Sequence, residues 1–239
     1  MSNFARKIEK THFHSAALGE ARSIRISYPP GFDPARLYPV LIGQDGEELF
    51  NFGRIVTQAN TMMAAGEIRP IFIVGIDSVS ATRTAEYHPD GERFPEYCRF
   101  IADELLSFLE QQYPVSDRAD DRVLIGDSLG GTVSLHLALD RPHLFQKVVS
   151  FSGAFYDPTR LRITEETDLS ALRVYQTVGL GEEAFETPHG VVNILDMNRI
   201  TKRLLKERNA DVTYIETEGT HIWGAWQPLI PGALRHFFG

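Results

Sequence analysis

The chain has 239 residues, 43% of them hydrophobic, and a formal net charge of −8 at pH 7. This length and apolar fraction are typical of one globular domain, so we expect a single domain over residues 1–239. The acidic balance, without a basic cluster, argues against binding of nucleic acid or of an anionic membrane. The single cysteine, Cys98, excludes an intramolecular disulfide, and we expect it in the core.

The sequence also lacks the usual signals for membrane insertion or export. No run approaches the roughly 18 apolar residues of a membrane span. The first ten residues are polar and charged and do not resemble a secretory signal. We therefore expect a soluble cytoplasmic protein, and we make no prediction of its oligomeric state.

Strand-like and helix-like segments alternate along the chain, which predicts βαβ units and a mostly parallel sheet with helices on both faces. The first strand should be antiparallel and half-exposed, because its polar and apolar residues alternate. The expected strands are 22–28, 38–42, 70–76, 122–125, 148–151, 172–178 and 212–215. The expected helices are 53–66, 96–113, 131–140, 197–208 and 227–238.

Two long loops, 77–95 and 182–193, should form most of the wall of any active site. Only about twenty residues separate the strands at 148–151 and 172–178, which leaves little room for a helical cap. We therefore expect a minimal cap or none.

The segment 122–140 carries the strongest functional signal. A short apolar strand runs into Gly126-Asp127-Ser128-Leu129-Gly130, and a helical pattern follows. Strand, sharp turn and helix form the context in which G-x-S-x-G becomes a nucleophile elbow. Glycines flank the serine because larger side chains would collide in so tight a turn. The sequence therefore predicts Ser128 as a nucleophile exposed at the carboxyl end of the sheet, facing the N-terminus of a helix.

A serine nucleophile needs a base and a carboxylate that holds the base. Five histidines follow Ser128. His221 follows the last strand, on a loop at the carboxyl edge, so we predict it as the base. His189 is the second candidate, since it lies on a loop near the expected acid. The others fit less well by position: His136, His143 and His236.

The acid should lie just beyond the strand 172–178. That strand opens into Gly179-Leu180-Gly181-Glu182-Glu183, and either glutamate is within reach of the base. Position favours Glu182, with Glu183 as the alternative. Asp196 and Asp157 remain open as further candidates.

Two other patterns suggest different chemistry and are set aside. Gly179-x-Gly181-x-x-Ala184 mimics a dinucleotide fingerprint, but two glutamates would stand where a pyrophosphate needs positive potential. His12 and His14 would share one side of a strand, but no third metal ligand accompanies them. We therefore predict no metal and no organic cofactor.

With these residues in place, the chain resembles the "Putative esterase" family of α/β-hydrolases, in its branch of enterochelin esterases and related siderophore trilactone hydrolases. That family also includes feruloyl and acetyl xylan esterases, S-formylglutathione hydrolases and mycolyltransferases. The resemblance covers nearly the whole chain and rests on several segments. They are 38–42 with Asp45-Gly46, Arg83-x-x-Glu86-Tyr87-x-Pro89, 100–105, 126–131, 150–154, Gly179-x-x-Glu182 and Gly219-Thr-His221-Ile-Trp223-x-x-Trp226.

The resemblance implies an α/β-hydrolase fold and an oxyanion hole built from the backbone N–H groups of Leu129 and Glu47. The chain departs from the family pattern beside the histidine, where Thr220 and Ile222 replace the usual Gly and Asp. Neither position is catalytic in the expected mechanism, so His221 stays the predicted base.

We predict a serine carboxylic-ester hydrolase that works through an acyl-enzyme on Ser128, with a small-molecule ester as its partner. Trp223 and Arg83 are the candidate substrate-binding residues, because an indole face stacks on aromatic groups and a guanidinium attracts an anionic ester. Siderophore trilactones or aryl esters are the first substrate classes. Acetyl or carbohydrate esters, acyl transfer to an alcohol, and a non-catalytic binding module of the same fold are the alternatives.

Overall fold

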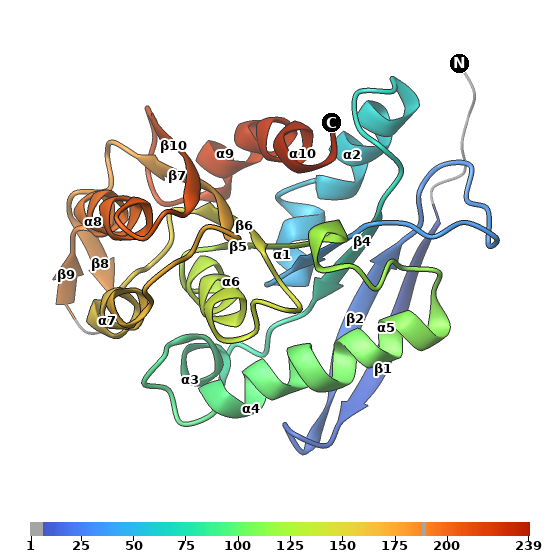
Figure 1. The fold of residues 1–239 in the computed structure, drawn as a ribbon, viewed down its shortest axis with the longest axis horizontal. Coiled ribbons are helices and arrows are strands. Elements are labelled where there is room, and N and C mark those ends of the chain that lie inside the picture. Colours follow the sequence, from blue (N-terminus) through green and yellow to red (C-terminus); the bar gives the residue numbers. More distant parts are fainter. Residues whose placement is uncertain (1–6, 188–189) are drawn as a thin grey trace.

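The computed structural model describes residues 7–187 and 190–239, and within these ranges an eight-stranded sheet forms the centre of the molecule (Figure 1). Its strand order is β1-β2-β4-β3-β5-β6-β7-β10. The pairs β1–β2 and β2–β4 are antiparallel, and every pair from β4 to β10 is parallel. The mostly parallel sheet of the sequence prediction is confirmed.

The strands of this sheet are β1 (Ile8–Ser15), β2 (Glu20–Ser27), β3 (Val40–Gly43), β4 (Phe72–Ile76), β5 (Arg122–Asp127), β6 (Lys147–Phe151), β7 (Arg173–Gly179) and β10 (Asp211–Thr217). A separate antiparallel hairpin joins β8 (Phe185–Thr187) to β9 (Gly190–Val192).

The α-helices are α1 (Gly46–Asn51), α2 (Ile55–Ala64), α3 (Arg83–Tyr87), α4 (Phe94–Arg99), α5 (Leu106–Gln112), α6 (Leu129–Asp140), α7 (Asp157–Glu165), α8 (Ile194–Lys206), α9 (Trp223–Trp226) and α10 (Ile230–Phe238). A π-helix, η1 (Phe100–Leu105), joins α4 to α5. Two 3₁₀ turns are η2 (Ala119–Asp121) and η3 (Gln227–Leu229).

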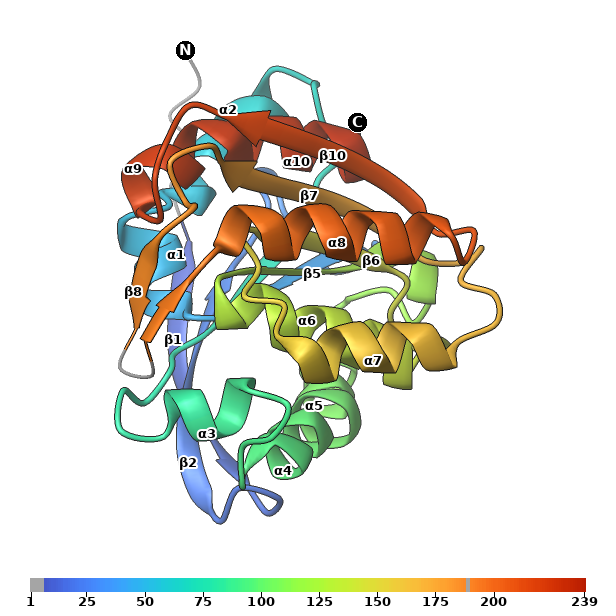
Figure 2. The same cartoon turned by 90° about the vertical axis from the view of Figure 1, so that its left-hand side faces the viewer.

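Helices cover both faces of the sheet, as an α/β fold requires. Figure 2 shows α2 and α10 on one side, and α8, α7, α6 and the α4–α5 helix on the other. Side chains along β5 alternate between these two layers. Val123 and Ile125 pack with the α2–α10 layer, whereas Leu124 packs with the α5–α6 layer. Because both faces are buried, β5 appears in the sequence as a continuous apolar run.

Some elements depart from the sequence prediction. A strand was considered only at His12 and His14, whereas β1 extends from Ile8 to Ser15 and pairs with β2 along its full length. The predicted helix 53–66 is α2, and a separate short helix, α1, precedes it. Gly53 and Arg54 separate the two helices. Arg54 has a left-handed φ of 51°, which interrupts the helix. A Cβ at Gly53 would clash with the carbonyl oxygen of Leu49 at 2.5 Å, so the close turn requires glycine.

The segments predicted as loops contain further structure. The stretch 77–95 holds α3, and 182–193 holds the β8–β9 hairpin. The helix α7 lies between β6 and β7, where no helix was predicted; its only fully buried side chains are Thr159 and Ile163, so it lacks an apolar stripe. Periodicity detects an apolar stripe and misses helices that bury so little.

The parallel strands end together at one edge of the sheet, and this edge positions the site. Asp127 lies beside Phe151, which lies beside Thr177, and Gly179 lies beside Thr217. The segments that follow β5, β7 and β10 therefore meet at this edge. No helix in the described part of the chain is long and apolar enough to cross a membrane.

Candidate active site

Ser128 occupies a strained turn between β5 and α6. Its φ of 52° and ψ of −125° fall where a residue with a side chain is rare. The turn is held by backbone hydrogen bonds, from Ser128 N–H to Phe151 O and from Ala154 N–H to Ser128 O. A Cβ on Gly126 would collide with the backbone of Gly130, which explains the glycine before the serine. This geometry is that of a nucleophile elbow.

His221 and Glu182 are joined by a short hydrogen bond. Nδ1 of His221 lies 2.6 Å from Oε2 of Glu182, and the two side chains are 7% and 1% exposed. A carboxylate at Nδ1 fixes the imidazole orientation and leaves Nε2 as the nitrogen that faces a reaction partner. Glu182 follows β7 and His221 follows β10, the neighbouring strands at the end of the sheet.

The other oxygen of Glu182 is held by two donors. Oε1 accepts hydrogen bonds from the Ser152 hydroxyl at 2.6 Å and from the Gly179 N–H at 2.7 Å. The Ser152 oxygen in turn accepts the indole N–H of Trp226 at 2.8 Å. Because that N–H occupies a lone pair of the hydroxyl, Ser152 directs its own proton to Glu182. Neither Ser152 nor the indole N–H was predicted from the sequence, although both lie in segments that carry the family resemblance.

The alternative acids lie elsewhere. Glu183 is exposed next to the buried Glu182. Asp196 is exposed, and its backbone N–H donates to the side chain of Asn193 at the start of α8. Asp157 is 80% exposed and pairs with Arg160.

The alternative bases are also separated from this cluster. His136 is buried in α6 and bonds to Thr159 Oγ1 at 3.0 Å. Burial lowers its pKa to about 4. His143 is exposed, and His236 lies on α10. His189 lies outside the described residues.

Ser128 and His221 line the same cavity, of about 1220 Å³. No hydrogen bond joins the two side chains in the described structure; such bonds often form only when substrate is bound. The cavity walls come from the segment around α3, the elbow, the β8–β9 hairpin and the segment after β10. A smaller cavity of about 400 Å³ lies beside Cys98, and Ser128 does not line it. The half-buried Cys98 has its pKa raised to about 12 by burial.

Arg83 lines the cavity, as predicted for a substrate-binding residue, but Asp45 holds its guanidinium. Nε and one Nη of Arg83 each lie 2.8 Å from an oxygen of Asp45. The Arg83 side chain is 27% exposed, whereas that of Asp45 is 3% exposed. This bidentate pair largely neutralises the positive charge that the sequence analysis assigned to the substrate.

Trp223 also lines the cavity, and its indole N–H donates to Glu48 Oε2 at 2.9 Å. Its ring meets that of Trp226 edge-on at 5.5 Å. The Phe185 ring lies 4.2 Å from the imidazole of His221, so the β8–β9 hairpin contacts this histidine directly. Phe185 was not predicted from the sequence, since nothing local marks the hairpin that presents it.

The two expected oxyanion donors lie at helix N-termini near the elbow. Leu129 is the first residue of α6 and lines the cavity. Glu47 is in the first turn of α1, next to Glu48, which lines the cavity. First-turn N–H groups have no partner within their own helix and are free to bind an anion.

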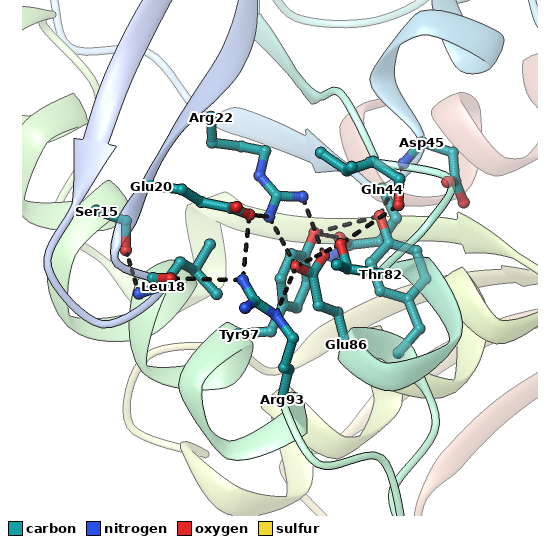
Figure 3. A network of polar contacts seen from close by, with 12 residues as sticks. Ser15, Leu18, Glu20, Arg22, Gln44, Asp45, Thr82, Glu86, Arg93 and Tyr97 are labelled. Atoms are coloured by element: carbon teal, nitrogen blue, oxygen red, sulfur yellow. Dashed lines mark hydrogen bonds and ion pairs between the residues drawn. The ribbon is translucent and has the colours of Figure 1, made fainter.

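A buried ionic network attaches α3 to the sheet (Figure 3). Arg22, from β2, donates to both oxygens of Glu86 at 3.0 and 2.8 Å, and these side chains are 1% and 0% exposed. Thr82 and Arg93 also donate to Glu86. Because α3 carries Arg83, this network fixes the helix that forms one wall of the cavity.

His12 and His14 both lie exposed on β1. Among the residues the structure describes, no group of three or more His, Cys, Asp or Glu side chains is arranged to hold a metal ion.

The amino-acid sequence is similar to those of several known proteins. The family model described as "Putative esterase" matches residues 15–237. Uncharacterized protein YjcH of Bacillus subtilis (strain 168) is 35% identical over 232 residues, which cover 95% of this chain and 96% of that protein. The Iron(III) enterobactin esterase of Escherichia coli (strain K12) is 28% identical over 146 residues, which are 61% of this chain and 36% of that protein.

Solved structures share the fold. A ferulic acid esterase superposes with a TM-score of 0.82 at 17% identity, covering 99% of both chains. The enterobactin esterase from Shigella flexneri, solved in the presence of enterobactin, gives a TM-score of 0.82 at 22% identity, covering 97% of this chain and 59% of that one. The chain therefore belongs to the family described as "Putative esterase" and is a carboxylic-ester hydrolase with the α/β-hydrolase fold.

Proposed function

We propose that the protein hydrolyses carboxylic esters through a triad of Ser128, His221 and Glu182. The observation that carries this proposal is the short Glu182–His221 hydrogen bond at the cavity that Ser128 also lines. A strained elbow, a carboxylate-bound imidazole and free helix N-termini are the components that serine esterases use.

In the proposed mechanism, the Ser128 hydroxyl attacks the ester carbonyl and His221 Nε2 takes its proton. The backbone N–H groups of Leu129 and Glu47 stabilise the oxyanion of the tetrahedral intermediate. His221 then gives the proton to the departing alcohol, which leaves an acyl group on Ser128. Water, deprotonated by His221, releases the acid and restores the serine. Glu182 stabilises the imidazolium during both steps.

Kinetics of single variants test this proposal. Ser128→Ala should reduce kcat on p-nitrophenyl butyrate by about 10³-fold or more, and His221→Ala by a similar factor, because triad members act as a unit. A fluorophosphonate probe should label the wild type and leave Ser128→Ala unlabelled. Wild-type turnover in Ser128→Ala would overturn the proposal, and a wild type without turnover or labelling would favour a non-catalytic module. Product analysis with an added alcohol separates hydrolysis from acyl transfer.

For the substrate, we propose an ester with an aromatic group. The rings of Trp223, Phe185 and Tyr156 line the cavity and offer flat apolar surfaces to such a group. The cavity volume of about 1220 Å³ also leaves room for an ester much larger than a short acyl chain. A kcat/KM for ethyl benzoate or ethyl cinnamate above that for ethyl acetate would support this class. A preference for acetyl esters would instead favour an acetyl or carbohydrate esterase.

A siderophore trilactone is the second candidate substrate. It is favoured by the similarity to Iron(III) enterobactin esterases, although the matched segment is 36% of the length of the relative from Escherichia coli (strain K12). Binding of an anionic catecholate would need a free positive charge, and the Arg83 guanidinium is held by Asp45. Hydrolysis of enterobactin, with and without iron, by wild type and Arg83→Met tests this candidate.

A further inference from the structure

The described residues that line the cavity carry an excess of negative charge. Glu48, Asp90 and Glu186 are exposed acidic residues in its wall, and Asp127 is a buried one. Among the described residues that line the cavity, Arg83 is the one arginine, and no lysine is present. Its charge is offset by Asp45, which lies outside the lining. A charged substrate therefore meets an acidic surface.

Asp127 is the unusual member of this group. It precedes Ser128 at the end of β5, it is 5% exposed, and its Oδ1 has no hydrogen-bond partner in the described structure. A buried carboxylate with an unpartnered oxygen is costly unless a counter-charge arrives or a proton neutralises it. Burial, and then the charge of Asp45, raise the pKa of Asp127 to about 8.

Three neighbours supply the charges that act on Asp127. Asp45 and Glu48 repel its carboxylate, and Arg83 attracts it. Because the Arg83 guanidinium already binds Asp45 through two nitrogens, it cannot also pair fully with Asp127. The group beside the nucleophile is thus a carboxyl that lacks a cation of its own.

The aromatic lining suits the same kind of ligand. Trp223, Tyr156 and Phe185 present rings to the cavity that contains Asp127. Aromatic faces attract ammonium groups, and they do so more strongly when water is excluded. A carboxyl group and aromatic faces that line one cavity are a combination that recognises ammonium cations.

We propose that the cavity selects esters that carry an ammonium group over neutral and anionic esters of the same shape, and that Asp127 determines this selection. The inference rests on the proposed ester hydrolysis and names the substrate class of that site. When the cationic ester binds, Asp127 is ionised and its proton passes to solvent.

Two benzoate esters that differ only in charge provide the test. Benzoylcholine carries a trimethylammonium group, and 3,3-dimethylbutyl benzoate replaces the nitrogen with carbon. In the wild type, kcat/KM for benzoylcholine should exceed that for the neutral ester by about tenfold or more. We call the quotient of these two kcat/KM values the ratio of the two esters. In Asp127→Asn, which keeps the side-chain shape, this ratio should fall to a value between about 1 and 3. The benzoate ester of 3-hydroxypropanesulfonate should be the poorest substrate in the wild type.

Glu218→Gln is the matched control. Glu218 is an exposed acidic residue three positions before His221, and it does not line the cavity. This variant removes one negative charge from the same region, so the ratio of the two esters should stay at the wild-type value. A second lining variant, Glu186→Gln, should lower the ratio by about two- to threefold, because its exposed charge is screened.

The kcat/KM ratio of benzoylcholine to the neutral ester can also be measured in the wild type as a function of pH, and this test does not require a variant to fold. Between pH 6.5 and 9 the ratio should rise as Asp127 ionises around pH 8. An effect of pH on the chemical step that both esters share cancels in the ratio. In Asp127→Asn the ratio should stay flat over this range.

A wild-type ratio of one or less, or an unchanged ratio in Asp127→Asn, would overturn the inference. Ser128→Ala separates this failure from failure of the proposed function. If that variant loses activity on both esters while the wild-type ratio is one, only the selection for cations is wrong. If it hydrolyses both esters at wild-type rates, the proposed triad is wrong as well.

Discussion

Glu182 and His221 are 39 residues apart in the chain, yet Oε2 of the glutamate lies 2.6 Å from Nδ1 of the imidazole. The parallel pairing of β7 with β10 creates this contact, because it brings the ends of both strands to one edge of the sheet. Glu183, the next residue, is exposed.

This arrangement predicts different effects for the two glutamates. Glu182→Gln should lower kcat by about 10²-fold or more, because an amide cannot stabilise the imidazolium as a carboxylate does. Glu183→Gln should stay within about twofold of wild type, as substitutions of exposed residues usually do. Steady-state kinetics on one activated ester check both variants. The reverse order of effects would move the acid to Glu183.

The Ser152 hydroxyl should act as a positioning group for Glu182. In Ser152→Ala, Glu182 Oε1 loses one of its two donors and the Trp226 N–H loses its acceptor. We expect kcat to fall by about tenfold with little change in KM, because the substrate does not contact Ser152. Trp226→Phe should give a smaller decrease, since the hydroxyl remains.

Ser150→Ala is the control for this prediction. Ser150 lies on β6, two residues before Ser152, is fully buried, and its hydroxyl has no partner in the described structure. Its removal should leave kcat within about twofold of wild type. Equal decreases in kcat for Ser150→Ala and Ser152→Ala would show that packing, and not the hydrogen bond to Glu182, is responsible.

The Arg22–Glu86 pair should support both stability and substrate binding. Glu86→Gln leaves the buried Arg22 without the buried carboxylate that binds two of its nitrogens, although the more exposed Glu20 remains at 2.7 Å. We expect the free energy of unfolding to fall by about 3 kcal/mol, the lower end for breaking a buried pair. KM should rise, because α3 forms a wall of the cavity. Urea unfolding and kinetics measure both effects.

The partly exposed pair Glu96–Arg99 offers a control for the buried network. Its side chains are 35% and 54% exposed, and it lies within one helical turn. Glu96→Gln should change the free energy of unfolding by less than about 1 kcal/mol. Equal losses for Glu86→Gln and Glu96→Gln would contradict the assigned role of the network.

His136 should make the protein less stable in mild acid. Its pKa in the folded state is about 4, against 6.5 for an ordinary histidine, because burial disfavours the charged form. Between pH 4 and pH 6.5, the histidine is therefore protonated in the unfolded chain and neutral in the folded chain. The free energy of unfolding should fall as the pH drops from 6.5 to 4, by up to about 3 kcal/mol. Above pH 6.5 this contribution is complete.

Comparing the free energy of unfolding of two histidine variants across this pH range tests the prediction. His136→Gln should flatten the decline between pH 6.5 and 4, whereas His143→Gln, at an exposed position, should keep it. A decline that persists unchanged in His136→Gln would assign the acid sensitivity to other groups.

The sequence indicated the sheet and the elbow because those features are local. A short apolar run such as Val123–Ile125, followed by G-x-S-x-G, can be identified within a dozen residues. The β8–β9 hairpin and α7 were missed because each buries few side chains, so neither carries a clear apolar period. Their positions are set by tertiary packing.

The predicted site residues differ in the same way. Chain order and loop position were enough to select His221 and Glu182 as candidates, and the structure brings these two side chains together. The bond between Arg83 and Asp45 joins residues 38 positions apart, and no local pattern indicates it. The isolated position of Asp127 depends on its burial beside that pair, which only the folded chain creates.

The central claim is that an acyl group forms on Ser128, and mass spectrometry of the trapped intermediate tests it most directly. The protein is mixed with p-nitrophenyl butyrate, quenched in acid within milliseconds and digested. We predict a butyryl adduct on the peptide that contains Ser128, and we predict that the adduct is absent from Ser128→Ala. An adduct on another residue, or wild-type turnover by Ser128→Ala, would contradict the account.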